Sequence, residues 1–115
     1  MASYSKELIS GGSANSRPIK VVAAATPGTL IHTGPTAPVK DELFLWCSNF
    51  DTADRTLTLE WGGVTSPDDL LLFTCPARDT ILVAGGLIIT GGLLVRAFGS
   101  VANMLVINGY ANRIS

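Results

Sequence analysis

The stretch from Asp41 to Gly63, DELFLWCSNFDTADRTLTLEWGG, predicts two β-strands joined by a polar turn. From Thr56 to Trp61 apolar and polar residues alternate strictly, which is the period of a strand with one buried and one solvated face. The preceding run from Leu43 to Cys47 is apolar at every position, so we expect this strand to be covered on both faces. A hairpin with one strand buried on both sides needs a second layer packed against it.

Short apolar runs between turn residues recur along the rest of the chain. The further strands we expect cover residues 18–25, 29–33, 69–75, 80–84, 87–90, 93–98 and 104–112. The glycine pairs at 85–86 and 91–92 fit either hairpin turns or bulges. Together these features predict an all-β fold: a single-domain antiparallel β-sandwich or small jelly-roll-like barrel of about eight short strands.

The first residues differ from the rest in being small and polar. They predict a flexible N-terminal arm over residues 1–17, ahead of a β-sandwich domain over residues 18–115. Within the arm, the run Lys6–Ile9 is expected to form a short helical turn at most. Two interpretations of the arm stay open: a disordered terminus, or a segment that becomes ordered on a neighbouring subunit.

The composition bears on possible partners. Charged residues make up only 15% of the chain, against about a quarter in ordinary domains, which suits a surface that contacts other protein. The net charge of −1 supplies no basic field for nucleic acid or anionic lipid, so we expect neither as a partner. Residues 81–95 carry no charge, but they are shorter than the roughly 20 residues of a spanning helix and predict buried strands.

The residues for catalysis or metal binding are few. His32 is the only histidine, and a lone histidine on a strand is more often a surface or internally bonded residue than a general base. A zinc site lacks a second histidine, and no recognisable spacing joins His32 to a serine and an aspartate, although a spatial triad stays possible. We therefore expect a protein that is not an enzyme, with no cofactor and no metal.

The two cysteines, Cys47 and Cys75, each lie inside an apolar run. Free cysteine in such a position behaves as a small core residue, and a disulfide between neighbouring strands is the alternative.

Four aspartates fall in two expected loops, at positions 51, 54, 68 and 69. If the loops met at one end of a sandwich, these carboxylates could hold calcium, but the capping of turns is the more common role of such residues. Glu60 is expected on the solvated face of its strand, where Arg55 or Arg96 could pair with it.

The aromatic residues also allow two interpretations. Trp46 and Trp61 could form a platform on which sugars stack, but each lies in a strand rich in leucine, which favours packing in the core. Phe50, at the turn after the first strand, is the aromatic residue expected to be most exposed.

Three segments carry a resemblance to a known class of proteins: DRTLTLEWGG followed by TSPDDLL (54–71), LLVRAF (93–98) and VINGYANRI (106–114). In these segments the chain resembles small β-rich virion proteins of tailed bacteriophages, over about residues 18–114. The resemblance implies a structural part of the particle, most like a capsid decoration (cement) protein on the capsid surface of the virion, made in the cytoplasm of the host bacterium. It implies the major capsid protein as partner and a homo-oligomer as the state of the chain.

Such proteins have binding surfaces and no catalytic site, so no residue role transfers from the resemblance. The contacts we expect lie in the arm and in two loops, at Ser5, Lys6, Glu7, Leu8, Arg17, Phe50 and Pro67. The alternatives are a component of the tail, neck or fibre base and, from another class, a carbohydrate-binding module that uses Trp46 or Trp61.

Overall fold

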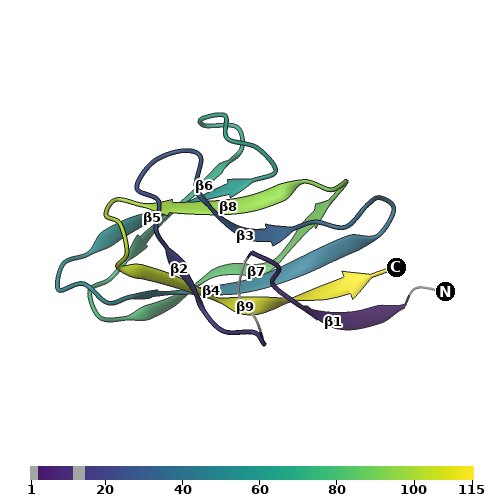
Figure 1. Ribbon diagram of the computed structural model, residues 1–115, viewed down its shortest axis with the longest axis horizontal. Helices are drawn as coiled ribbons and strands as arrows, with labels where there is room; N and C mark the ends of the chain where they lie inside the picture. Colours follow the sequence, from purple (N-terminus) through teal and green to yellow (C-terminus); the bar gives the residue numbers. More distant parts are fainter. Residues whose placement is uncertain (1–2, 12–14) are drawn as a thin grey trace.

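The computed structural model describes residues 3–11 and 15–115, and within them the chain forms nine β-strands and no helix (Figure 1). The strands are β1 (Tyr4–Leu8), β2 (Ile19–Val21), β3 (Thr29–Thr33), β4 (Lys40–Asn49), β5 (Arg55–Trp61), β6 (Leu70–Cys75), β7 (Thr80–Thr90), β8 (Leu94–Gly99) and β9 (Leu105–Ile114). The prediction of an all-β antiparallel sandwich is therefore confirmed.

The strands form two antiparallel sheets that lie one above the other in Figure 1. The larger sheet has the order β1-β9-β4-β7, with β2 also paired to β9, and the smaller has the order β3-β8-β5-β6. The expected hairpin of β4 with β5 is wrong, because β4 belongs to the larger sheet and β5 to the smaller one. Residues 50–54 carry the chain from one layer to the other, which lets both strands bury their inner faces against each other.

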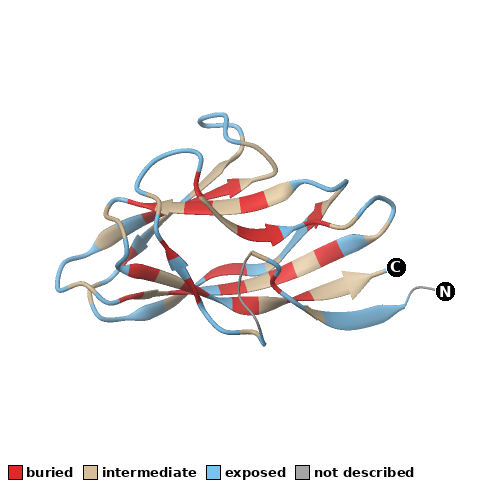
Figure 2. Ribbon diagram, in the orientation of Figure 1, coloured by how far each residue is buried: buried red, intermediate tan, exposed pale blue. Residues whose placement is uncertain are grey.

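The core lies between the two layers, where buried positions alternate with exposed ones along most strands (Figure 2). Leu45 and Ile107 from the larger sheet and Leu57 and Leu59 from the smaller one are fully buried. Alternation of this kind follows from the pleat, which sends successive side chains to opposite faces of a sheet.

The exposure of the two central strands is the reverse of the expectation. On the outer face of β4, Trp46 is 36% exposed, so neither full coverage of this strand nor core packing of Trp46 is correct. On the outer face of β5, Thr58 and Glu60 are buried, and Glu60 is only 1% exposed. For Glu60 the cause is the loop of residues 22–28, whose Gly28 N–H donates to Glu60 Oε1 over 2.6 Å. Glu60 is thus not on a solvated face.

The N-terminal segment belongs to the sheet. Residues 4–8 form β1, which pairs with the end of β9 from Tyr4 opposite Ile114 to Leu8 opposite Tyr110. Ile9 is buried in the core. The expected helical turn at residues 6–9 is wrong, because the pairing with β9 satisfies the backbone groups of an extended segment. Residues 1, 2 and 12–14 of the expected arm lie outside the described residues.

The two glycine pairs have different roles. Gly85 and Gly86 interrupt no strand, since β7 runs through them and the β4–β7 register shifts on either side of Phe44 and Leu45, as at a bulge. Gly91 and Gly92 form the turn between β7 and β8, both with φ +70°.

The two cysteines face each other across the layers. Cys47 of β4 and Cys75 of β6 are both buried and free, with their Sγ atoms 3.5 Å apart. This confirms core thiols rather than a disulfide.

A search of residues 3–11 and 15–115 for a helix long and apolar enough to cross a bilayer finds none.

Candidate functional site

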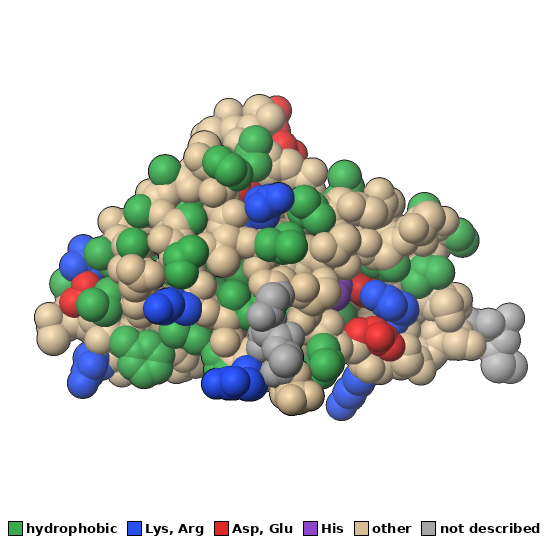
Figure 3. Space-filling view, viewed as in Figure 1, with side chains coloured by type: hydrophobic (Ala, Val, Ile, Leu, Met, Phe, Trp, Pro, Cys, Tyr) green, Lys and Arg blue, Asp and Glu red, His purple; other side chains and the backbone are tan. Residues whose placement is uncertain are grey.

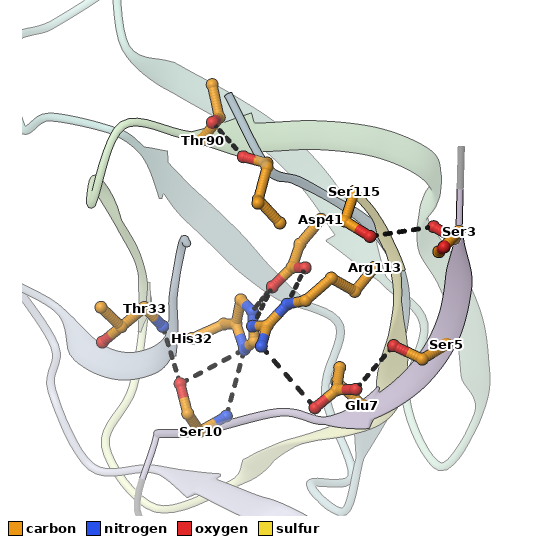
Figure 4. A network of polar contacts seen from close by, with 11 residues as sticks. Ser3, Ser5, Glu7, Ser10, His32, Thr33, Asp41, Thr90, Arg113 and Ser115 are labelled. Atoms are coloured by element: carbon orange, nitrogen blue, oxygen red, sulfur yellow. Dashed lines mark hydrogen bonds and ion pairs between the residues drawn. The ribbon is translucent and has the colours of Figure 1, made fainter. Parts of the chain in front are cut away.

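A buried polar network joins the two sheets near the chain termini (Figure 4). Asp41, at the start of β4, lies directly opposite Arg113 of β9 and is fully buried. Arg113 donates from Nε to Asp41 Oδ1 over 2.8 Å and from Nη2 to Oδ2 over 3.0 Å. Burial raises the pKa of Asp41, but the hydrogen bonds and charges of Arg113 and His32 outweigh it and hold this pKa below its usual value. Asp41 is therefore a carboxylate.

His32 connects this ion pair to the smaller sheet. Its ring is buried on β3, and its Nε2 lies 2.7 Å from Asp41 Oδ2. Its Nδ1 accepts the backbone N–H of Ser10 over 3.1 Å, so the proton of the neutral ring is on Nε2 and is donated to Asp41. Each ring nitrogen thus has a partner.

The Ser10, His32 and Asp41 side chains have the composition of a nucleophilic triad. Ser10 Oγ lies 3.3 Å from His32 Nδ1 and also accepts the backbone N–H of Thr33 over 2.8 Å. A general base needs a free lone pair aimed at the hydroxyl, whereas this Nδ1 already accepts the Ser10 N–H at the shorter distance. The geometry therefore supports a structural role for His32, which holds the N-terminal segment against β3, rather than a catalytic role in which it activates the Ser10 hydroxyl.

Glu7 completes the network on β1. Its Oε1 lies 3.7 Å from Arg113 Nη1, and Ser5 Oγ donates to its Oε2 over 2.9 Å. In the view of Figure 3, acidic and basic side chains lie next to each other beside β1, and further basic side chains are spread over the same face. The network holds β1 against the sheet through side chains as well as through backbone pairing.

The aspartates of the two loops do not meet. Asp51 and Asp54 precede β5, whereas Asp68 and Asp69 follow it, so the pairs lie at opposite ends of that strand. Asp51 bonds Arg55, and Asp69 accepts the N–H of Thr65. In the described part of the chain no cluster of three His, Cys, Asp or Glu residues could hold a metal ion. These aspartates serve as turn residues.

The outer face of the larger sheet carries three aromatic side chains, Phe44, Trp46 and Tyr110, which we term the aromatic row. The rings of Phe44 and Tyr110 stack with centroids 5.2 Å apart, and Trp46 lies 6.4 Å from Tyr110. Lys6 Nζ, from β1 on the other side of β9, lies 5.3 Å from the centroid of the Tyr110 ring. The sequence reasoning missed Phe44 and Tyr110; the signal that could have identified them is that both share the outward parity of their strands.

The expected contact residues do not form one surface. Lys6 and Leu8 lie on the outer face beside the aromatic row, whereas Ser5 and Glu7 point to the opposite side of β1, toward Arg113. The other three are exposed and lie elsewhere in the fold: Arg17 before β2, Phe50 at the far end of β4, and Pro67 in the loop after β5.

A second exposed apolar region lies where the edges of the two sheets meet, at β6 and β7; we term it the open edge. Its most exposed residue is Leu72 of β6, at 70%, and Leu87 and Ile88 of β7 are also exposed. Between the strands is an open groove of about 290 Å³, lined by Trp61, Asp68, Asp69, Leu70, Leu71, Leu87 and Ile88. The indole of Trp61 donates to the Ile88 carbonyl over 2.9 Å and links the sheets at this edge.

Comparisons with protein families, with curated proteins and with solved structures find no match to this chain.

Proposed function

We propose that this protein is a non-catalytic structural protein of a bacteriophage virion that binds the major capsid protein and reinforces the capsid shell. The observation that carries the proposal is the aromatic row on the outer face of the larger sheet, which is flanked by the exposed Leu8 opposite Tyr110. Exposed apolar patches of this kind on a soluble domain mark contacts with another protein, and Tyr and Trp are enriched at such contacts. The resemblance to phage virion proteins supplies the partner.

The packing of the rings supports protein rather than sugar as the ligand. A sugar stacks on a free ring face, whereas one face of Tyr110 is covered by Phe44 and the other by Lys6. Phe44 and Lys6 come from strands on opposite sides of β9, so the ring stands upright between them. With both faces covered, Tyr110 offers no stacking platform for a sugar, and the row is better suited to packing against protein.

The attachment of β1 favours a preformed binding surface. Leu8 and Lys6 are fixed beside the aromatic row by pairing with β9 and by the polar network around Arg113. A surface that is ordered before binding loses little conformational entropy on association. A protein that binds only the assembled shell stabilises it by mass action, in proportion to its own concentration and affinity.

The non-catalytic part of the proposal is supported by the hydrogen bonds of His32. Both ring nitrogens are bonded inside the protein, and the ring is buried. The hydrogen bonds of His32 therefore have a structural role: they connect the N-terminal segment, β3 and β4.

The test is binding of the purified protein to empty expanded capsids of the particle whose genome encodes the chain. We expect hundreds of copies per shell, counted by gel densitometry, since a decoration protein occupies positions repeated by the capsid symmetry. The variant Trp46→Ser should lose most of this binding. Val64→Ser, which changes an exposed apolar residue in the loop between β5 and β6, should keep it. Equal binding by both variants, or no binding by the intact protein, would overturn the proposal.

Two alternatives have distinct outcomes. A tail, neck or fibre-base component would bind its particle at about a dozen copies, as set by the symmetry there. A carbohydrate-binding module is favoured by one observation, the exposure of Trp46 on a sheet face. It predicts signals on a glycan array that disappear in Trp46→Ala while the circular dichroism spectrum stays unchanged.

A further inference from the structure

The outer edge of β6 presents backbone groups to solvent. Within the described chain, β6 pairs with β5 alone, in unbroken register from Leu70 opposite Glu60 to Cys75 opposite Arg55. The N–H of Trp61 bonds the carbonyl of Asp69, and in an antiparallel ladder bonded and non-bonded pairs alternate. The N–H and C=O groups of Leu72 and Thr74, and the C=O of Leu70, therefore point away from β5.

This edge lacks the features that normally prevent pairing with another strand. Such features are charged side chains, bulges and prolines within the strand. The residues of β6, LLLFTC, include none of them. The other edge strands described have such features. β1 carries Lys6 and Glu7, and β2 carries Lys20. The pairing of β3 has one register shift, and that of β7 has two.

The side chains around this edge are apolar. Leu72 points outward from the smaller sheet and is the most exposed large hydrophobic residue described. Leu71 and Phe73 point inward, at the margin of the core, beside the groove that Leu87 and Ile88 also line. A strand paired to β6 would cover both sets of side chains and satisfy the backbone edge.

We infer that the occupant of this edge is the β6 strand of a second copy of the chain, paired antiparallel about a two-fold axis. A two-fold contact requires a surface that is complementary to itself. Leu72 then lies opposite Leu72 of the other copy, and the two exchange both backbone hydrogen bonds. Each Thr74 N–H reaches the Leu70 carbonyl of the other copy. Of the registers that the outward groups allow, we infer this one because it covers the most exposed side chain, Leu72, with its own copy. It keeps the outer faces of the two sheets on one side.

The charges at the two ends of β6 match this arrangement. Asp68 precedes the strand and Arg78 follows it, and both are exposed. Antiparallel pairing brings the end of each β6 that follows Asp68 next to the end of the other copy that precedes Arg78. Opposite charges therefore meet at both ends of the paired strands. The inference is independent of the proposed function, because β6 belongs to the smaller sheet, whereas the aromatic row lies on the outer face of the larger sheet.

The first experiment measures the molar mass of the intact chain by light scattering and sedimentation over a concentration series. We expect a dimer. Leu72→Lys places two ammonium groups next to each other on the axis and should weaken dimerisation at least about 100-fold. Val64→Lys makes the same change at an exposed residue outside the edge and should leave the dimer intact. A monomeric intact chain, or equal masses for the two variants, would overturn the inference.

A second measurement keeps the test valid if Leu72→Lys fails to fold. In the inferred pair the two Leu72 Cα atoms are about 5.5 Å apart, within the range of a disulfide. Leu72→Cys should therefore crosslink to a dimer under a mild disulfide oxidant, whereas Val64→Cys should not. Arg78→Asp should weaken the dimer several-fold, and the double variant Arg78→Asp, Asp68→Arg should restore it. Absence of the Leu72→Cys crosslink would contradict the pairing even if the chain forms some other oligomer.

Discussion

Arg113 of β9 lies directly opposite Asp41 of β4 and donates two hydrogen bonds, of 2.8 and 3.0 Å, to its buried carboxylate. This pair is the centre of the network that reaches His32 on the other sheet and Glu7 on β1. It therefore connects the two chain ends to both layers of the sandwich.

Removing the charge of Asp41 should destabilise the fold. Asp41→Asn leaves Arg113 without its main partner and changes the acceptor of His32 Nε2. Loss of one partner from a buried pair costs about 3–5 kcal/mol, and we expect about 3 kcal/mol because Arg113 is partly exposed. Urea unfolding followed by tryptophan fluorescence measures the change. Asp68→Asn, an exposed site, should stay within about 0.5 kcal/mol of the parent; equal stability of both variants would contradict the role of the pair.

Asp41 also makes stability depend on pH. Its pKa in the folded state is below its ordinary value of 3.8, so at low pH the unfolded chain binds the proton more readily. The stabilisation is complete above about pH 4 to 5 and is lost as the pH falls through the folded-state pKa. The free energy of unfolding of the parent should fall more steeply below about pH 4 than that of Asp41→Asn. Parallel curves would show that another carboxylate governs acid unfolding.

The stacked pair Phe44 and Tyr110 should be energetically coupled. Offset-stacked aromatic pairs contribute about 0.5–1.5 kcal/mol beyond the area that they bury. A double-mutant cycle with Phe44→Leu and Tyr110→Leu should give a coupling energy in this range by denaturant unfolding. Strictly additive losses would mean that the two rings contribute separately.

Gly109 should tolerate no side chain. A Cβ at this position would overlap the Phe44 carbonyl oxygen and approach Leu45 Cα within 3.0 Å, in the pairing of β9 with β4. Gly109→Ala should therefore lower stability by about 3 kcal/mol or more, since backbone rather than a side chain must move. Gly91→Ala is the matched control: no atom lies within 4 Å of its added Cβ, and only its φ of +70° costs about 1–2 kcal/mol. Thermal melts compare the two.

The two central strands show how far sequence patterns extend. The alternation at residues 56–61 correctly predicts β5, yet the parity expected to be solvated is buried at Thr58 and Glu60. The apolar run at 43–47 correctly predicts β4, yet Trp46 is exposed. The periodicity of a sequence indicates which residues lie on the same face of a strand. Whether that face is buried depends on segments distant in the sequence, such as the loop at 22–28.

The candidate surfaces were predictable to different extents. Lys6 and Leu8 were expected contacts and lie beside the aromatic row, but their grouping with Phe44 and Tyr110 requires the order β1-β9-β4. The pairing of Asp41 with Arg113 joins residues 72 positions apart, and no local sequence pattern indicates such a contact.

The amino-acid sequence by itself determined the all-β class, the positions of most strands and the core thiols, because these depend on local propensity and on the period of two along each strand. Only the tertiary structure decided that β4 and β5 lie in different sheets, that β1 pairs with β9, and that β6 is an edge strand of the smaller sheet. These features depend on which strands pair, and pairing is governed by the total burial and hydrogen bonding of segments far apart in the chain.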